Sequence, residues 1–174
     1  MGLSKYASCS YAPGCVNVYS NDTSGFAQAV QLAAQADRVV LVVGNTVNGD
    51  NPFRETEGHD RQSLNLPGEQ EELIAQVAAA SAKPIVLVVI AGGCIDLSQA
   101  KSNPKVGAIL WSGYAGQSTG DAVAMTLFGD NNPSGRLTQT FYPQSYVEGI
   151  SMFDMDMRAN PAKVSREPCE LRPL

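Results

Sequence analysis

The densest group of ionisable side chains in the sequence lies at residues 54–61. Its acids are Glu55, Glu57 and Asp60, and its bases are Arg54, His59 and Arg61. A carboxyl group that is flanked by other acids and partly removed from water becomes easier to protonate, as a general acid requires. The same residues can instead form a solvated charge run held by internal ion pairs, and their spacing alone favours that simpler interpretation.

Other catalytic and cofactor-binding patterns are less convincing. The glycines at 92–93 and at 113, 116 and 120 match neither the dinucleotide fingerprint nor a Gly-Lys-Ser/Thr phosphate loop, so tight turns explain them better than a free-standing nucleotide-binding protein does. A serine or cysteine nucleophile needs a partnered base, and the single histidine lies in the polar cluster. The four cysteines lack the two-residue spacing of a zinc knuckle. We therefore expect no metal and no other cofactor.

Alternating strands and helices are predicted to position these candidate residues. Apolar and β-branched runs predict strands at 38–44, 84–90, 106–111 and 137–141. Helical spacing of apolar residues predicts helices at 26–33, after 67, near 97–101 and at 121–128. The uninterrupted β-branched run at 38–44 is typical of a strand buried on both faces. The order of elements implies right-handed crossovers and a mostly parallel sheet covered on both faces. Ligands of such sheets collect at the carboxyl ends of the strands, where the loops 45–66, 91–96 and 112–120 begin.

Length, composition and charge exclude several classes of protein. A chain of 174 residues with 44% hydrophobic content fits one folded domain. Its net charge of −5 includes no basic stripe, which argues against a nucleic acid partner. The longest apolar run, 85–91, falls well short of the roughly 20 residues of a membrane span.

The cysteines, one sequon and the two ends of the sequence bear on the location of the protein. Residues 1–6 carry no apolar segment of a signal peptide. Asn21 begins the sequon Asn-Asp-Thr, which is meaningful for glycosylation in a secreted eukaryotic protein. Cys9 and Cys15 can close a short disulfide loop if the protein is exported, or remain thiols packed as small hydrophobes. Residues 162–174 are charged and interrupted by proline, so we expect a tail that is disordered or foreign to the domain.

Several motifs follow one another in a fixed order along the sequence. The first motif runs from Glu55 to Arg61 and continues as Leu-Asn-Leu-Pro-Gly-Glu-Gln at 64–70. Further motifs lie at 11–15, 92–93 with Asp96, 109–114 with 116–117, 128–137, 140–143 and 154–158. Together they resemble the second domain of glycoside hydrolase family 3, with β-xylosidases and β-glucosidases of plants and fungi as the nearest likeness.

The resemblance implies an α/β fold with a partner domain. In this family the second domain is a three-layer α/β sandwich, with a mostly parallel sheet of about six strands and helices on both faces. Residues 1–161 are expected to form it. The family packs this domain on an N-terminal (β/α)8 barrel, which residues 1–174 do not contain and which we expect as the partner in the full-length enzyme. An apolar surface should face that barrel.

The resemblance also implies a function and roles for the charged cluster. It indicates retaining, exo-acting hydrolysis of terminal β-linked sugars in plant cell-wall oligosaccharides, with an aspartate of the barrel as nucleophile and Glu57 or Glu55 as the acid/base. Glu57 fits better because it directly precedes the glycine. Asp60, Arg61 and His59 would contact substrate or organise the loop. The isolated chain should then be inactive, and the full-length protein secreted or bound to the cell wall. A non-catalytic carbohydrate-binding or scaffold module of the same fold is the alternative.

Overall fold

The computed structural model describes residues 2–48, 53–133, 135–151 and 153–155. The elements in chain order are the 3-10 turn η1 (Leu3–Lys5), α1 (Phe26–Gln35), β1 (Val40–Gly44), α2 (Gln70–Ala80), β2 (Ile85–Ile90), α3 (Ser98–Ser102), β3 (Val106–Trp111), α4 (Thr119–Phe128) and α5 (Gln144–Gly149). The expected tail 162–174, Cys169, Ser134 and the motif residues 156–158 lie outside the described residues.

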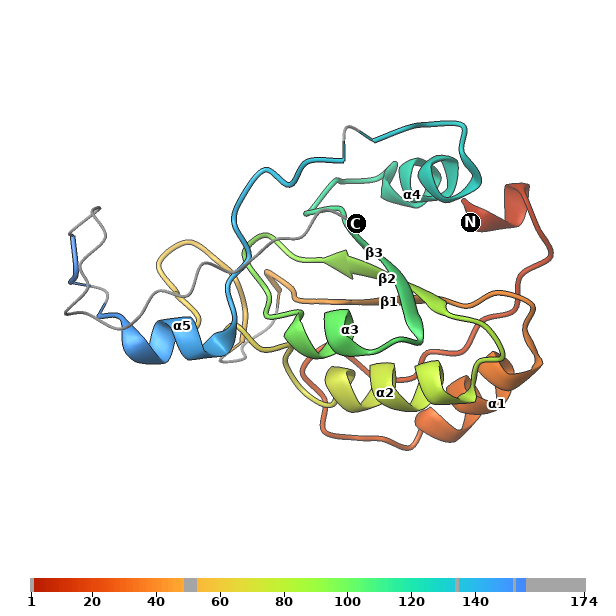
Figure 1. The fold of residues 1–174 in the computed structure, drawn as a ribbon, viewed down its shortest axis with the longest axis horizontal. Helices are drawn as coiled ribbons and strands as arrows, with labels where there is room; N and C mark the ends of the chain where they lie inside the picture. The colour runs from red at the N-terminus through yellow and green to blue at the C-terminus, as the bar shows by residue number, and fades with distance from the viewer. Residues whose placement is uncertain (1, 49–52, 134, 152, 156–174) are drawn as a thin grey trace.

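The three strands form a parallel sheet in the order β1-β2-β3, as the alternation of strands and helices predicts. α1, α2 and α3 lie on one face of the sheet and α4 lies on the side of the other (Figure 1). Three predicted strands are therefore confirmed, and so are the four predicted helices. None of the described helices is long and apolar enough to cross a membrane.

The described part of the chain has three strands, so the expected number of about six is wrong for it. The predicted strand at 137–141 is also wrong, because this segment is irregular and pairs with no strand among the described residues. It begins two residues after Gly135, whose φ is 71°, and its Leu137 side chain is half exposed. Phe141 instead packs its ring edge-on against Trp111, with 5.8 Å between centroids, so side-chain packing places the segment.

The core lies between the sheet and the helices α1 to α3. One cluster joins the sheet to α2 and α3 and contains Val43, Leu66, Ile74, Leu87, Val89, Ala91, Ile95 and Ala100. A second joins α1 and α2 and contains Phe26, Ala33, Leu73, Val77, Ala78 and Ile85. The helical spacing of Leu73, Ile74, Val77 and Ala78 on α2 predicts this inward face, and all four side chains are buried.

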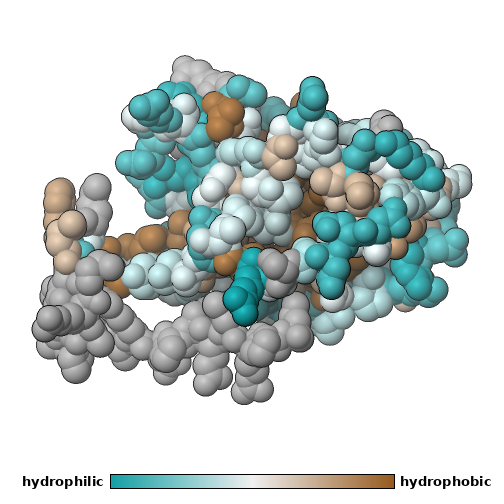
Figure 2. All heavy atoms as spheres, turned by 90° about the horizontal axis from the view of Figure 1, so that it is seen from above, coloured by the Kyte–Doolittle hydropathy of each residue, from teal (hydrophilic) through white to brown (hydrophobic). Residues whose placement is uncertain are grey.

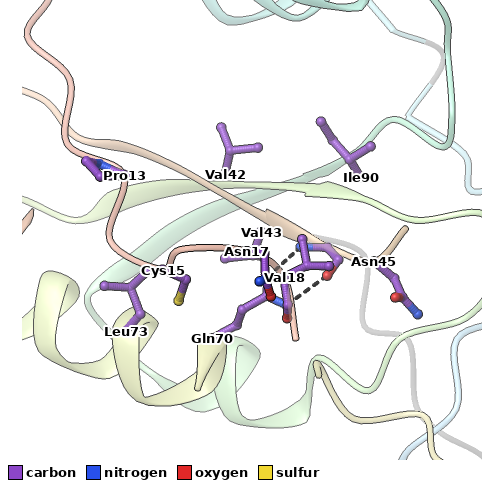
Figure 3. A pocket seen from close by; sticks show the side chains of 11 residues that line it. Pro13, Cys15, Asn17, Val18, Val42, Val43, Asn45, Gln70, Leu73 and Ile90 are labelled. Carbon is purple, nitrogen blue, oxygen red and sulfur yellow. Dashed lines mark hydrogen bonds between the residues drawn. The ribbon is translucent and has the colours of Figure 1, made fainter. Parts of the chain in front are cut away.

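The opposite face of the sheet is less completely covered. Val42 on β1 remains 55% exposed, so the prediction that this strand is buried on both faces is wrong. The reason is that Val42 points away from α2, toward the less completely covered face of the sheet (Figure 3). From the α4 side, apolar side chains are visible between hydrophilic ones (Figure 2).

The carboxyl ends of the three strands lie level, as the parallel topology requires. Gly44 pairs with Ile90, and Val89 pairs with Trp111. Two further backbone bonds extend the ladder beyond the strand ends, from the Asn45 N–H to the Ile90 carbonyl at 2.9 Å and from the Ser112 N–H to the Val89 carbonyl at 3.0 Å. The three following loops therefore leave the same edge of the sheet, where the charged cluster is expected.

Candidate active site

Residues 56–59 form a tight hairpin turn that carries Glu57 at its tip. Thr56 and His59 pair as an antiparallel bridge, and the His59 N–H donates to the Thr56 carbonyl at 3.0 Å. Gly58 occupies the third position of the turn with φ of 74°, a conformation that glycine adopts without a Cβ penalty. Glu57, at the second position, is exposed.

Glu55, two residues earlier, is held inside the junction of the three loops. Its Oε2 accepts a hydrogen bond from the Gly92 N–H at 2.8 Å and another from the Tyr114 hydroxyl at 2.6 Å. Arg61 Nη2 lies 2.9 Å from its Oε1, and the Glu55 side chain is 13% exposed. One carboxylate thus joins the loops that follow β1, β2 and β3.

The Arg61 contact is an ion pair without an aligned hydrogen bond, because Glu55 Oε1 is buried and accepts no hydrogen bond from the described residues. The Arg61 guanidinium instead donates its hydrogen bonds to backbone carbonyls. Nη2 donates to the Cys94 carbonyl at 2.7 Å and Nη1 to the Ser63 carbonyl at 3.2 Å. Arg61 therefore ties the hairpin to the loop after β2, in the kind of organising position that the resemblance implies.

The other predicted site residues lie on the same hairpin but less deeply. His59 is half-buried, and its backbone closes the turn. Asp60 is exposed, and the acid that faces Arg61 is Glu55. The structure therefore gathers the whole charged cluster at the carboxyl end of the sheet, with one acid enclosed and the others at the surface.

Gly92 and Gly93 are needed because backbone must approach Glu55 closely. A Cβ on Gly92 would lie 2.7 Å from Tyr114 Cε2, and one on Gly93 would lie 3.3 Å from Glu55 Oε1. Neither glycine has a positive φ. The chain bends at this pair, and room for the carboxylate and the phenol ring explains why both residues are glycines.

Tyr114 is the residue at this junction that the sequence reasoning did not single out. It follows Gly113, which has φ of 60°, on the loop after β3, and it is 43% exposed. Burial and the hydrogen bond to the Glu55 carboxylate raise the pKa of the Tyr114 phenol. The hydroxyl consequently remains a hydrogen-bond donor throughout the physiological range. A lone tyrosine among the glycines of a strand-end loop was the available signal.

Asp96 and Gln144 connect the loop after β2, the start of α5 and the segment that follows the hairpin by hydrogen bonds. The Gln144 N–H donates to Asp96 Oδ2 at 2.8 Å, and Gln144 Oε1 accepts from the Leu64 N–H at 2.6 Å. Burial raises the pKa of Asp96, but the hydrogen bonds from Ser98 and Gln144 outweigh it and leave the pKa below its ordinary value. α5 is thereby attached to the segment that leads out of the hairpin.

Residues 116–120 read Gly-x-Ser-x-Gly, the pattern of a serine nucleophile elbow, but the structure argues against that role. In such an elbow the serine sits on the sharp turn between a strand and the next helix. Ser118 follows the end of β3 by seven positions and is instead the exposed residue before α4. The pattern therefore marks the start of a helix.

A cavity of about 280 Å³ lies beside β1 and reaches the carboxyl end of that strand at Gly44 and Asn45 (Figure 3). Its lining includes Val42, Cys15, Leu73 and Gln70, and it contains no acid, histidine, lysine or arginine. The Gln70 carboxamide is already engaged with the Gly44 backbone. The cavity offers no group for acid/base catalysis.

The predicted glycosylation site and three of the four cysteines lie among the described residues. Asn21 is exposed on an irregular segment before α1. Cys9, Cys15 and Cys94 are free thiols, so the Cys9–Cys15 disulfide is not formed; Cys9 is exposed, and Cys15 packs against the second core cluster. Within the described ranges, no three His, Cys, Asp or Glu side chains gather as a metal-binding group.

The chain matches a known family model and several curated proteins. The family model described as the glycosyl hydrolase family 3 C-terminal domain matches residues 2–166. Probable beta-D-xylosidase 6 of Arabidopsis thaliana is 46% identical over 88% of this chain and 19% of its own length. Beta-xylosidase/alpha-L-arabinofuranosidase 1 of Medicago sativa subsp. varia is 45% identical over 92% of this chain and 20% of its own length.

Solved structures give the same result. A GH3 exo-beta-xylosidase in complex with a xylobiose aziridine probe matches with a TM-score of 0.77 and 39% identity, over 88% of this chain and 19% of that one. A beta-D-glucoside glucohydrolase from Trichoderma reesei matches with a TM-score of 0.56 and 28% identity, over 81% of this chain and 19% of that one. The chain spans about a fifth of the length of these relatives.

Proposed function

Because this chain belongs to the family of C-terminal domains of family 3 glycosyl hydrolases, we propose that it carries the acid/base of a retaining, exo-acting β-glycosidase. The observation that supports this role is the hairpin at the carboxyl end of the sheet. It is anchored at Glu55 and presents Glu57 at its exposed tip.

The two glutamates differ in what their carboxyl oxygens are free to do. A general acid must bring an oxygen within hydrogen-bond reach of the leaving-group oxygen. Glu55 Oε2 already accepts two hydrogen bonds and Oε1 faces Arg61, within a side chain that is 13% exposed. Glu57 is exposed and occupies the second position of the turn that the Thr56–His59 bridge closes. We assign the acid/base to Glu57 and an anchoring role to Glu55.

The proposed reaction divides two carboxyl groups between two domains. In retaining hydrolysis one carboxylate attacks the anomeric carbon, while the other protonates the departing oxygen and later deprotonates the attacking water, with about 5–5.5 Å between them. Glu57 supplies the second carboxyl group, and an aspartate of an N-terminal (β/α)8 barrel supplies the first. Docking against the barrel brings Glu57 beside the departing oxygen. The isolated chain is then inactive.

The substrate class follows from the names of the relatives. Several are β-xylosidases, some are also named α-L-arabinofuranosidases, and solved relatives include β-glucosidases. We propose terminal β-linked xylose or glucose of plant cell-wall oligosaccharides as the substrate. We also propose that the full-length protein is secreted or held in the cell wall, where the exposed Asn21 sequon is available for glycosylation. Residues 1–161 are proposed as the domain.

The test is Glu57→Gln and Glu55→Gln in a full-length enzyme, with Glu72→Gln on the exposed face of α2 as the matched control. Hydrolysis of xylobiose needs a proton on the leaving group, whereas hydrolysis of a 2,4-dinitrophenyl xyloside does not. We expect Glu57→Gln to lower kcat/KM for xylobiose by about 10²–10⁴-fold and to spare glycosylation by the activated substrate. Azide, which needs no general base, should restore turnover of the activated substrate as the glycosyl azide.

The outcomes separate the candidates. A selective loss with azide rescue in Glu55→Gln, and none in Glu57→Gln, would transfer the acid/base to Glu55. Normal xylobiose turnover in both variants would refute the acid/base role of the hairpin. A sugar-binding or scaffold module would then be the remaining interpretation, tested by titrating the isolated chain with xylo-oligosaccharides.

A further inference from the structure

Tyr114 is an aromatic side chain that is held at two points and still open to solvent at the carboxyl end of the sheet. Its hydroxyl donates to Glu55 Oε2 at 2.6 Å. Its ring lies so close to Gly92 that a Cβ there would be 2.7 Å from Tyr114 Cε2 and 3.1 Å from Cδ2. One end and one edge of the phenol are therefore fixed. The residue is nevertheless 43% exposed, so part of the ring faces solvent beside the enclosed carboxylate.

The backbone that carries this ring is fixed as well. Gly113 turns the chain shortly after β3 with φ of 60°, and a Cβ there would lie 3.6 Å from the Trp111 ring. The Trp111 Nε1–H donates to the Ala91 carbonyl at 3.1 Å, and the Trp111 ring meets Phe141 edge-on. A side chain that is already ordered before a ligand arrives loses little conformational entropy when the ligand binds. Tyr114 therefore offers a preorganised aromatic surface.

We propose that the Tyr114 ring is a binding platform for the sugar residue on the leaving-group side of the glycosidic bond. This inference rests on the proposed function, a β-glycosidase, but not on which glutamate of the hairpin transfers the proton. Either carboxyl group must come within hydrogen-bond reach of the departing oxygen. The side chains around the hairpin consequently lie nearest to the group that this oxygen belongs to after cleavage. Tyr114 contacts the hairpin directly, through Glu55.

The chemistry of a pyranose suits such a surface. In a β-linked xylose or glucose residue the hydroxyl groups project around the rim of the ring, and the axial C–H groups form an apolar face. The face of an aromatic ring is the negative end of its quadrupole, which attracts the weakly positive hydrogens of these C–H groups. Contact between the two faces also removes apolar surface from water. The phenol ring of Tyr114 can therefore bind a sugar residue without a charged group.

The experiment removes the ring and the hydroxyl separately in the full-length enzyme. Tyr114→Phe loses the hydroxyl and keeps the ring, whereas Tyr114→Leu loses both. Each variant is assayed on xylobiose, whose leaving group is a sugar, and on methyl β-xyloside, whose leaving group is methanol and also needs a proton. Cellobiose and methyl β-glucoside form the equivalent pair for a glucosidase.

We expect Tyr114→Leu to lower kcat/KM for the disaccharide about ten-fold relative to the methyl glycoside. Tyr114→Phe should leave the ratio of the two values close to that of the wild type, because the ring is retained. Tyr11→Leu, at a 75% exposed tyrosine outside this junction, is the matched control and should also leave the ratio unchanged.

The ratio separates a binding platform from a structural support. Loss of folded enzyme lowers both rates together, and loss of the hydrogen bond to Glu55 is common to Tyr114→Phe and Tyr114→Leu. A ratio that falls equally in these two variants, or in neither, would overturn the platform and leave the proposed function intact. If Tyr114→Leu does not fold, Tyr114→Met removes the ring in the same comparison. Failure of the wild-type full-length enzyme to hydrolyse either pair of substrates would overturn the proposed function, and this inference with it.

Discussion

Gln70 provides the sharpest test of how the sheet is held at the end that carries the hairpin. Its Oε1 accepts from the Gly44 N–H at 2.8 Å, and its Nε2 donates to the Gly44 carbonyl at 2.8 Å. The same Nε2 also donates to the carbonyls of Val18 at 2.7 Å and Pro67 at 3.0 Å. Gln70 is 3% exposed. The carboxamide therefore replaces a neighbouring strand at the outer edge of β1, where Gly44 ends (Figure 3).

Gln70→Met removes these hydrogen bonds while keeping a side chain of similar length and helix propensity. Two buried groups of Gly44 are left unpaired, and each costs about 1–3 kcal/mol. Burial of the more apolar methionine offsets part of this loss. We expect the free energy of unfolding to fall by about 2–4 kcal/mol, out of the roughly 5–15 kcal/mol of a typical domain.

The control is Gln76→Met on the same helix, where the exposed carboxamide donates a hydrogen bond to Glu72 Oε1 at 2.8 Å. A pair of this type at i,i+4 contributes about 0.2–0.5 kcal/mol. Urea unfolding of the 174-residue chain, followed by far-UV circular dichroism and by the fluorescence of its single tryptophan, Trp111, measures both variants. If the two variants differ by less than about 0.5 kcal/mol, Gln70 does not satisfy the Gly44 backbone and the account given for this edge is wrong.

Three further changes test the hairpin and its supports. Gly58→Ala places a Cβ at φ of 74° with no heavy atom within 4 Å, so we expect a purely conformational cost of about 1–2 kcal/mol in urea unfolding, and a smaller one for Gly58→Asn. Gly92→Ala puts a Cβ 2.7 Å from the Tyr114 ring, and it should lower xylobiose turnover in the full-length enzyme more than Gly93→Ala, whose nearest contact is 3.3 Å. Burial raises the pKa of Asp96, but its hydrogen bonds lower it more, so the pKa in the folded state lies below the unfolded pKa of about 3.9. The ionised Asp96 therefore stabilises the fold above the unfolded pKa, and this stabilisation is lost as the pH falls through the folded pKa. The slope of unfolding free energy against pH below about 4 should therefore be shallower in Asp96→Asn.

The elements that the sequence predicts well are those fixed by local patterns. The β-branched runs of β1 and β2 and the apolar spacing of α2 depend on neighbours within a few residues, and they predict the element type and the buried face. The segment 137–141 has a similar composition but lacks a partner strand in the described structure, so its pattern alone misleads. Val42 shows the same limit, because a run of β-branched residues does not reveal whether both faces of the strand are covered.

The sequence predicts where the candidate site lies in the fold, but it does not predict what each of its residues does. Parallel topology brings the three strand-end loops together, so the cluster at 54–61 had to lie among them. The partners of Glu55, however, come from 37 and 59 residues away, and no local pattern pairs a carboxylate with a glycine N–H and a phenol at such separations. Tyr114 was missed for this reason.

The same contacts explain why two glutamates two residues apart are suited to different tasks. A hairpin turn places Glu55 before the turn and Glu57 within it, so one side chain is drawn into the loop junction while the other is left at the surface. On the proposed assignment this separation is useful, because the anchored acid keeps its ionic contacts while the exposed acid meets a new environment when the domains dock. A catalytic pair divided between two domains then has its acid/base completed only by docking. The hairpin must already be rigid at that moment, since any freedom at Glu57 would have to be removed during the reaction itself. The convergence of Gly92, Tyr114 and Arg61 on Glu55 supplies that rigidity from within the domain.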